Sequence, residues 1–196
     1  YYDFSDGTLL CLTPGESISM KDSDNTCPSK GWILAFHPDL ICGTVLGANI
    51  RDYTFFSYRP EEALHVSLRE KQVILELLDK INEELQRCID CYSQKIISKY
   101  IELLLDYCER FYERQFITRN EANKKIIERF DRLLDDHFNT IQSQSSDLPT
   151  IEECVRVLRL SPAYFNDLLE YETGKSYKEY LQFKRCLLYT SPSPRD

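Results

Sequence analysis

Residues 150–174 read TIEECVRVLRLSPAYFNDLLEYETG, and the second half of the chain is organised around them. Thr150 and Glu153 have the spacing of a capping box, in which each side chain binds the other residue's backbone amide where a helix begins. Ser161 can cap a second helix only a few residues later, and Pro162 fits its first position. Gly174 is expected to end the second helix, because glycine readily adopts the left-handed conformation found at helix C-termini. We therefore expect two short helices joined by a tight turn, a helix-turn-helix.

Apolar residues recur at helical spacing in both segments, so each helix has a face that can be buried. The first helix carries Ile151, Cys154, Val155 and Leu158, and the second carries Tyr164, Phe165, Leu168 and Leu169. Two helices joined so closely must cross steeply, which leaves the first turn of the second helix projecting outward. That geometry suits the major groove of DNA.

Residues 161–185, SPAYFNDLLEYETGKSYKEYLQFKR, resemble the core of AraC/XylS-type transcription regulators. The family pattern runs from a Ser-x-x-Tyr opening through Glu-Thr-Gly-Lys-Ser to a Tyr-Leu pair, and the matching positions are Ser161, Tyr164, Leu168, Glu172, Thr173, Gly174, Lys175, Ser176, Tyr180 and Leu181. The resemblance implies a cytoplasmic bacterial regulator that binds promoter DNA as a homodimer. It also implies a small-molecule effector and contact with RNA polymerase, and it implies no catalysis.

In the family, the outward positions on the first turns of the second helix read the bases, and they map to Ala163, Asn166 and Asp167. Asn can pair bidentately with adenine, Asp can accept from cytosine, and Ala can touch a thymine methyl group. Contacts with phosphates need basic side chains. The candidates are Lys175, Lys178, Lys184 and Arg185, and an ordinary solvated helix face is the alternative for each.

Three features depart from the family pattern. Arg159 stands at a turn position where such motifs often carry Gly, and a positive φ there would cost a residue with a side chain roughly 1–2 kcal/mol. Val155 replaces the small residue that usually lets the two helices approach. Asp167 and Glu170 place negative charge on the face that is expected near phosphates.

Charge and composition are those of an ordinary globular protein. The 196 residues are 42% hydrophobic, enough for a sizeable core, and carry a net charge of −8. Residues 1–118 hold 12 Lys and Arg against 19 Asp and Glu, whereas residues 119–185 hold 11 against 12. Most of the acidity therefore lies outside the expected DNA-binding part. Eight cysteines without a signal peptide or a long apolar run indicate a reducing cytoplasm.

The predicted fold class is α+β and mostly α, beginning with a β-rich segment over residues 1–63. Strands are expected at 8–13, 16–20 and 31–38, the last as a buried strand. In the resembling family this position holds the end of a cupin-like sensing barrel that binds the effector. The aromatic residues of this segment could line such a pocket or simply fill the core.

Residues 64–117 change to a period of about 3.6, which predicts two long helices. The first should run from Ser67 to about Asp90. In the second, Leu103, Leu105 and Tyr107 widen the apolar side beyond what one partner helix needs, which indicates a dimer interface. Packing of both helices against the barrel is the alternative.

The DNA-binding half should begin near Thr118, where Thr118 and Glu121 repeat the capping-box spacing at the start of a third helix. The expected domain covers residues 118–185 and holds the first of the family's two helix-turn-helix motifs. Residues 186–196, CLLYTSPSPRD, look like a translated sequencing adapter and are expected to be non-native. The chain is thus expected to be a piece of a longer protein, truncated at both ends.

No catalytic, metal or cofactor site is expected. His37, His65 and His137 are scattered along the chain, and Cys88-x-x-Cys91 is a lone pair without a second one for zinc. Two rival functions remain. A cupin-like protein that binds a small molecule or acts as an enzyme predicts ligand binding without salt-sensitive DNA affinity. A pure dimerisation protein predicts that Asn166→Ala leaves DNA occupancy unchanged.

Overall fold

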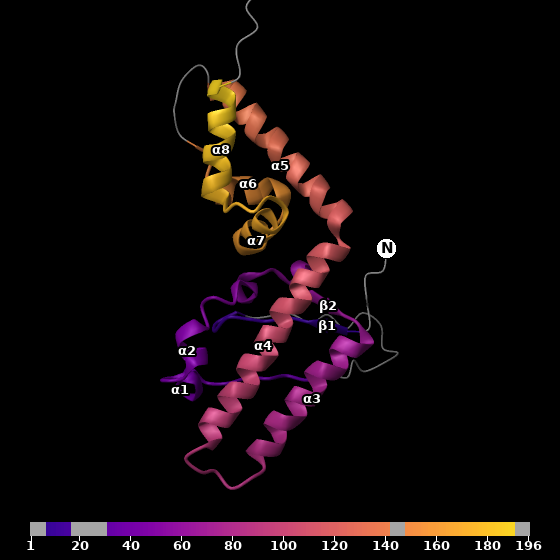
Figure 1. Cartoon of the computed structure of the whole chain (residues 1–196), viewed down its shortest axis with the longest axis vertical. Coiled ribbons are helices and arrows are strands. Elements are labelled where there is room, and N and C mark those ends of the chain that lie inside the picture. Colours follow the sequence, from indigo (N-terminus) through magenta and orange to yellow (C-terminus); the bar gives the residue numbers. More distant parts are fainter. Residues whose placement is uncertain (1–6, 17–30, 142–147, 191–196) are drawn as a thin grey trace, which may run out of the picture. The chain divides into compact units, whose positions relative to one another are not determined.

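The computed structural model describes residues 7–16, 31–141 and 148–190, and it is mostly helical (Figure 1). The chain divides into two compact units. We call Phe4–Phe56 with Leu64–Phe111 the hairpin unit, and Ser57–Ala63 with Tyr112–Asp196 the C-terminal unit. The division falls inside one long helix, and the short Ser57–Ala63 segment belongs to the C-terminal unit although residues on both sides of it belong to the hairpin unit.

The hairpin unit contains a two-stranded antiparallel sheet. Its strands are β1 (Gly7–Leu9) and β2 (Leu64–Val66), with Gly7 opposite Val66 and Leu9 opposite Leu64. Four short helices of the described residues lie between them in sequence: α1 (Pro38–Ile41), α2 (Val45–Asn49), η1 (Thr54–Ser57) and η2 (Pro60–Glu62). These two strands form no barrel within the described residues. Most of the described elements are helices, so the predicted mostly-α fold class is confirmed.

The buried strand predicted at 31–38 is wrong. Residues 31–37 have no regular structure, and α1 begins at Pro38 behind a cap in which the His37 ring accepts a hydrogen bond from the Asp39 amide. Trp32 and Ile33 are 58% and 93% exposed, because no described strand pairs with this run to cover it. The strand predicted at 8–13 is present only as β1, and most of 16–20 lies outside the described residues.

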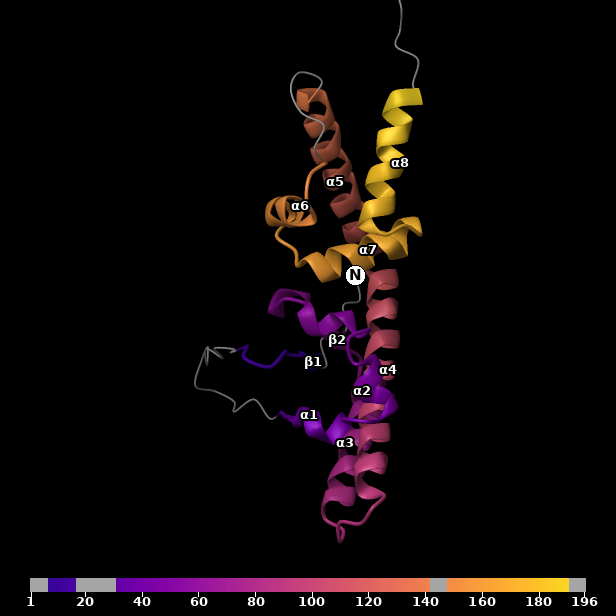
Figure 2. The same cartoon turned by 90° about the vertical axis from the view of Figure 1, so that its left-hand side faces the viewer.

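Two long helices form the antiparallel hairpin that gives this unit its name (Figures 1 and 2). Helix α3 (Leu68–Leu85) begins at a capping box between Ser67 and Glu70. It ends before the predicted limit at Asp90, which instead accepts hydrogen bonds from the amides of Tyr92 and Ser93 at the start of α4 (Ser93–Thr118). The core of the hairpin contains Ile74, Leu77, Ile81, Ile97, Ile101, Leu104, Leu105 and Cys108.

The third helix begins differently from the prediction. Helix α4 runs through Thr118, whose hydroxyl donates back to the Gln115 carbonyl at 3.1 Å, so the capping box with Glu121 does not form. Helix α5 (Asn120–Ile141) starts one residue after Arg119. Asn123, 1% exposed, fixes this junction because its side-chain amide donates to the Phe116 carbonyl at 2.9 Å. A buried amide with a partner on the preceding helix holds the change of direction in place.

Helices α5, α6 (Ile151–Leu158), α7 (Pro162–Thr173) and α8 (Tyr177–Thr190) build the rest of the C-terminal unit (Figure 2). Their shared core contains Phe130, Leu134, Cys154, Val155, Leu158, Phe165, Leu169, Tyr177, Tyr180 and Leu181. The predicted apolar faces of α6 and α7 are thereby confirmed. Helix α8 continues past Arg185, so 186–190 extend it, and 191–196 lie outside the described residues.

Candidate functional site

The α6–α7 pair has the local geometry that its sequence predicts. The Thr150 amide donates to Glu153 Oε2 at 2.9 Å, and Thr150 Oγ1 accepts from the Glu153 amide at 3.4 Å. Hydrogen bonds from the backbone amide and the side chain of Thr150 lower the pKa of the Glu153 carboxyl. At the second start, Ser161 Oγ accepts from the Tyr164 amide at 3.2 Å. Gly174 ends α7 with φ 67°, and its amide donates to the Glu170 carbonyl at 2.8 Å.

The turn between the two helices depends on Arg159, which has φ 62° and ψ 40°. Among the described residues it is the one non-glycine residue with a positive φ. This conformation lets the Leu160 amide donate to the Val155 carbonyl at 3.1 Å, which closes the turn directly before Ser161. Val155 is 3% exposed, so the larger side chain at this position fits into the core of the helix pair.

The start of α7 is completed by a residue from a distant part of the chain. Glu62 is only 4% exposed, and it ends the short helix η2 (Pro60–Glu62). Its carboxylate accepts from the Ser161 amide at 2.6 Å, from the Ser161 hydroxyl at 2.5 Å and from the Arg59 amide at 2.7 Å. In a capping box, a Glu or Gln at the third helical position accepts a hydrogen bond from the backbone amide of the cap residue. The third helical position of α7 is Tyr164, which has no carboxylate or amide oxygen to accept this bond. Glu62 takes this role across 99 positions of sequence.

A second contact joins the same segment to the outward side of α7. The Tyr58 hydroxyl donates to Asp167 Oδ2 at 2.7 Å. The Tyr58 ring packs edge-on against Tyr112 and Tyr164, each with ring centroids 5.1 Å away. The sequence contains no local signal for either the Glu62 or the Tyr58 contact, because the partners are about half the chain apart.

The structure places all three predicted base-reading residues on α7, where each is partly buried. Asp167 accepts the Tyr58 hydroxyl bond described above. Asn166 Oδ1 accepts from the Tyr177 amide at 3.1 Å and so caps the start of α8. Bidentate pairing of Asn166 with adenine would leave that amide without this partner, whereas the Asn166 Nδ2 group can still donate. Ala163 lies in the first turn of α7.

The four predicted phosphate-binding residues differ in their surroundings. Lys184 Nζ lies 2.8 Å from Asp131 Oδ1, so much of its charge is neutralised within the unit. Lys175 lies 5.0 Å above the Phe183 ring, and Lys178 and Arg185 are exposed. Burial, together with a hydrogen bond to Asp131, raises the pKa of Tyr180 beside this ion pair.

The predicted dimer-face residues separate into two kinds. Leu105 is 5% exposed and packs in the core of its own unit, so its expected place on the dimer face is corrected. Leu103 is 43% exposed, and Tyr107 is partly buried. Leu103 lines both of two neighbouring grooves of about 760 Å³ and 510 Å³.

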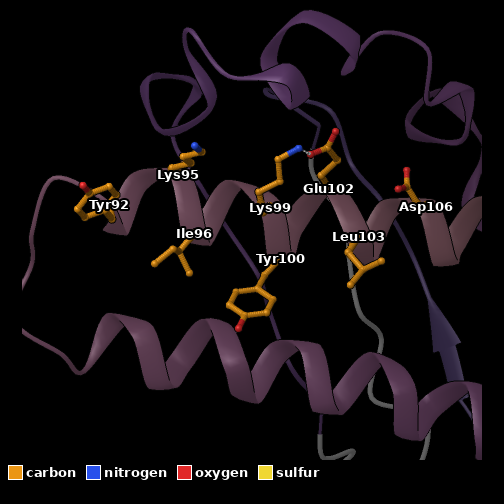
Figure 3. A pocket seen from close by; sticks show the side chains of 8 residues that line it. All are labelled: Tyr92, Lys95, Ile96, Lys99, Tyr100, Glu102, Leu103 and Asp106. Atoms are coloured by element: carbon orange, nitrogen blue, oxygen red, sulfur yellow. Dashed lines mark hydrogen bonds and ion pairs between the residues drawn. The ribbon is translucent and has the colours of Figure 1, made fainter.

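Charge differs between the two grooves. The larger one runs along α4 and contains two lysines, Lys95 and Lys99, together with the carboxylates of Glu102 and Asp106. Lys99 is paired with Glu102, and Figure 3 shows all four side chains on the side of α4 opposite Ile96 and Leu103. The smaller groove runs along α3 and includes the acidic residues Glu76, Asp79 and Glu83. Leu103 lines both grooves, and the smaller groove has three carboxylates against the single lysine Lys80.

Metal binding, free cysteines and membrane spans also bear on function in the described part of the chain. It contains no group of three or more His, Cys, Asp or Glu side chains that could hold a metal ion. Cys88 and Cys91 are both exposed. None of the described helices combines the length and apolar character required to cross a bilayer.

The chain matches no protein-family model, and no curated protein or solved structure is significantly similar to it. Function is therefore inferred from the residues and contacts of the chain itself.

Proposed function

We propose that the chain is a DNA-binding transcription regulator of the AraC/XylS type, in which α6 and α7 form a helix-turn-helix and α7 enters the major groove. The observation that carries this proposal is the α6–α7 turn, with its left-handed Arg159 followed directly by the Ser161 cap. Two capped helices joined by so short a turn are the arrangement that presents a recognition helix to DNA. The same residues carry the resemblance to the family.

In this proposal Ala163 and Asp167 contact base edges, and Asn166 contributes its Nδ2 donor while its oxygen holds α8. Lys175, Lys178 and Arg185 supply the phosphate contacts. Lys184 contributes less, because Asp131 already neutralises it. With only three proposed phosphate contacts, binding should be weak at physiological salt and strengthen as salt is lowered.

The second part of the proposal is a homodimer formed through the hairpin unit. In a two-fold dimer the same face of each chain meets the other, so the face must complement itself. The proposed contact is centred on Leu103, an exposed leucine that lines both grooves and would meet the same residue of the partner chain at the two-fold axis. A small effector bound by the β-containing part and contact with RNA polymerase complete the proposed regulator, as the resemblance implies.

DNA binding is tested by titrating the full chain against duplexes selected from a random-sequence pool, at two salt concentrations. Lys178→Ala should weaken binding to all selected duplexes similarly and reduce the salt slope by about one. Lys125→Ala is the matched control, because Lys125 is also exposed but lies on α5. Asp167→Asn should instead change which base is preferred at one position. Absence of salt-dependent binding would refute the proposal.

Dimerisation is tested by sedimentation of Leu103→Asp, which places a charge at the centre of the proposed interface and should shift the chain to the monomer. Leu85→Asp is the control, because Leu85 is also exposed, at 57%, but lines neither groove. Equal effects of the two substitutions would contradict this interface.

The alternative is a cupin-like or dimerisation protein that does not bind DNA. The engagement of Asp167 and Asn166 by other parts of the same chain favours it. It predicts that the wild-type chain dimerises through Leu103 while no duplex from the random pool is enriched.

A further inference from the structure

We propose that Ser57–Ala63, which we call the clamp segment, competes with DNA for the N-terminal turns of α7, so that DNA binding requires its release. This inference rests on the proposed DNA-binding function. It concerns regulation of the same helix, and two independent contacts of the clamp segment carry it.

The first contact is that of Glu62. A helix N-terminus attracts anions because its backbone N–H groups and the helix dipole both point positive charge outward. When a recognition helix enters the major groove, its N-terminal region faces the DNA. Glu62 already places a carboxylate at this end of α7, bound by both the amide and the hydroxyl of Ser161. A backbone phosphate approaching this end would meet a negative charge.

The second contact is that of Tyr58. Its hydroxyl holds the Asp167 carboxylate, and its ring lies against Tyr164 in the first turn of α7. A base edge can reach Asp167 only if this hydrogen bond breaks. The two contacts together cover both the end of α7 and its proposed base-reading side.

The clamp segment is also placed where another part of the chain can control it. Phe56 before it and Leu64 after it belong to the hairpin unit, and Leu64 is in strand β2. The Gln115 side chain donates to the Ala63 carbonyl at 3.3 Å and holds the end of the segment. A ligand that rearranges β2 or the residues before Ser57 would therefore pull on the clamp segment directly, through the backbone.

The test compares Glu62→Gln with Glu61→Gln in the full chain. Both substitutions remove one negative charge, but Glu61 is exposed and Glu62 binds α7. Affinity is measured by fluorescence anisotropy with duplexes from the random-sequence pool. Glu62→Gln should bind about tenfold more tightly than Glu61→Gln, because a charge-assisted hydrogen bond becomes a weaker neutral one. Amide exchange at the start of α7 should be faster in Glu62→Gln without any DNA.

If Glu62→Gln does not fold, Tyr58→Phe replaces it. The control is then Tyr53→Phe, which removes the equivalent tyrosine–aspartate bond of 2.6 Å to Asp106 in the hairpin unit. Tighter binding by the clamp variant than by its control supports competition. Equal or weaker binding by the clamp variant, with clear binding by the wild type, overturns the clamp but leaves the DNA-binding function in place. Absence of binding by every variant overturns both.

Discussion

Replacement of Arg159 by Gly should stabilise the α6–α7 pair. Arg159 has φ 62°, a conformation that costs a residue with a side chain roughly 1–2 kcal/mol. Glycine removes that strain but adds chain entropy to the unfolded state, which costs about 0.5–1 kcal/mol. The Arg159 side chain is exposed, so no packing is lost. The net gain should be about 0.75 kcal/mol, the difference between the midpoints of the two ranges.

Native-state amide exchange of the α6 and α7 peptides is the suitable assay. The only tryptophan, Trp32, lies in the hairpin unit, so its fluorescence does not report on this pair. A gain of this size should slow exchange about two- to fivefold. Arg156→Gly is the control: Arg156 is also exposed but lies within α6, and Gly there should destabilise by about 1 kcal/mol. Faster exchange in both variants would refute the assignment of strain to Arg159.

Three further predictions concern burial and ionisation. Leu169→Ala, at a fully buried position, should destabilise the C-terminal unit by about 2–5 kcal/mol in urea unfolding followed by circular dichroism, whereas Val157→Ala, at a 54% exposed position, should cost less than about 0.5 kcal/mol. Burial and a neighbouring carboxylate raise the pKa of Tyr180 above its usual 10.0, so its contribution to stability should be complete below pH 10 and fall as the pH rises beyond it. Tyr180→Phe should reduce that alkaline loss. Burial raises the pKa of the Cys11 thiol to about 12, so at about pH 8 iodoacetamide should label Cys11 far more slowly than the exposed Cys88, and equal rates would contradict this.

Local signals in the sequence were sufficient for the capped helices of the C-terminal unit. A capping box joins residues three apart, so Thr150 and Glu153 can specify a helix start without help from the rest of the chain. Ser161 and Gly174 act over equally short distances. The left-handed conformation of Arg159 could be anticipated for the same reason, because the turn between two such close helices leaves few alternatives.

Local sequence signals gave wrong predictions at two places where tertiary packing determines the secondary structure. Thr118 and Glu121 have capping-box spacing, yet α4 continues through Thr118 and the buried Asn123 sets the junction instead. The apolar run at 31–38 matches a buried strand, but a strand needs neighbours to supply its hydrogen bonds and cover its side chains. Among the described residues it has neither, so Ile33 remains exposed.

Local sequence signals were enough to place the starts of α6 and α7, the end of α7, and the apolar faces of these two helices. The Glu62 cap of α7 and the bond between Tyr58 and Asp167 depend instead on tertiary packing, because these partners lie 99 and 109 residues apart. No sequence period connects residues at such separations. Their meeting depends on how the whole unit packs, which also decides whether the outward face of α7 is open to a partner or occupied by its own chain.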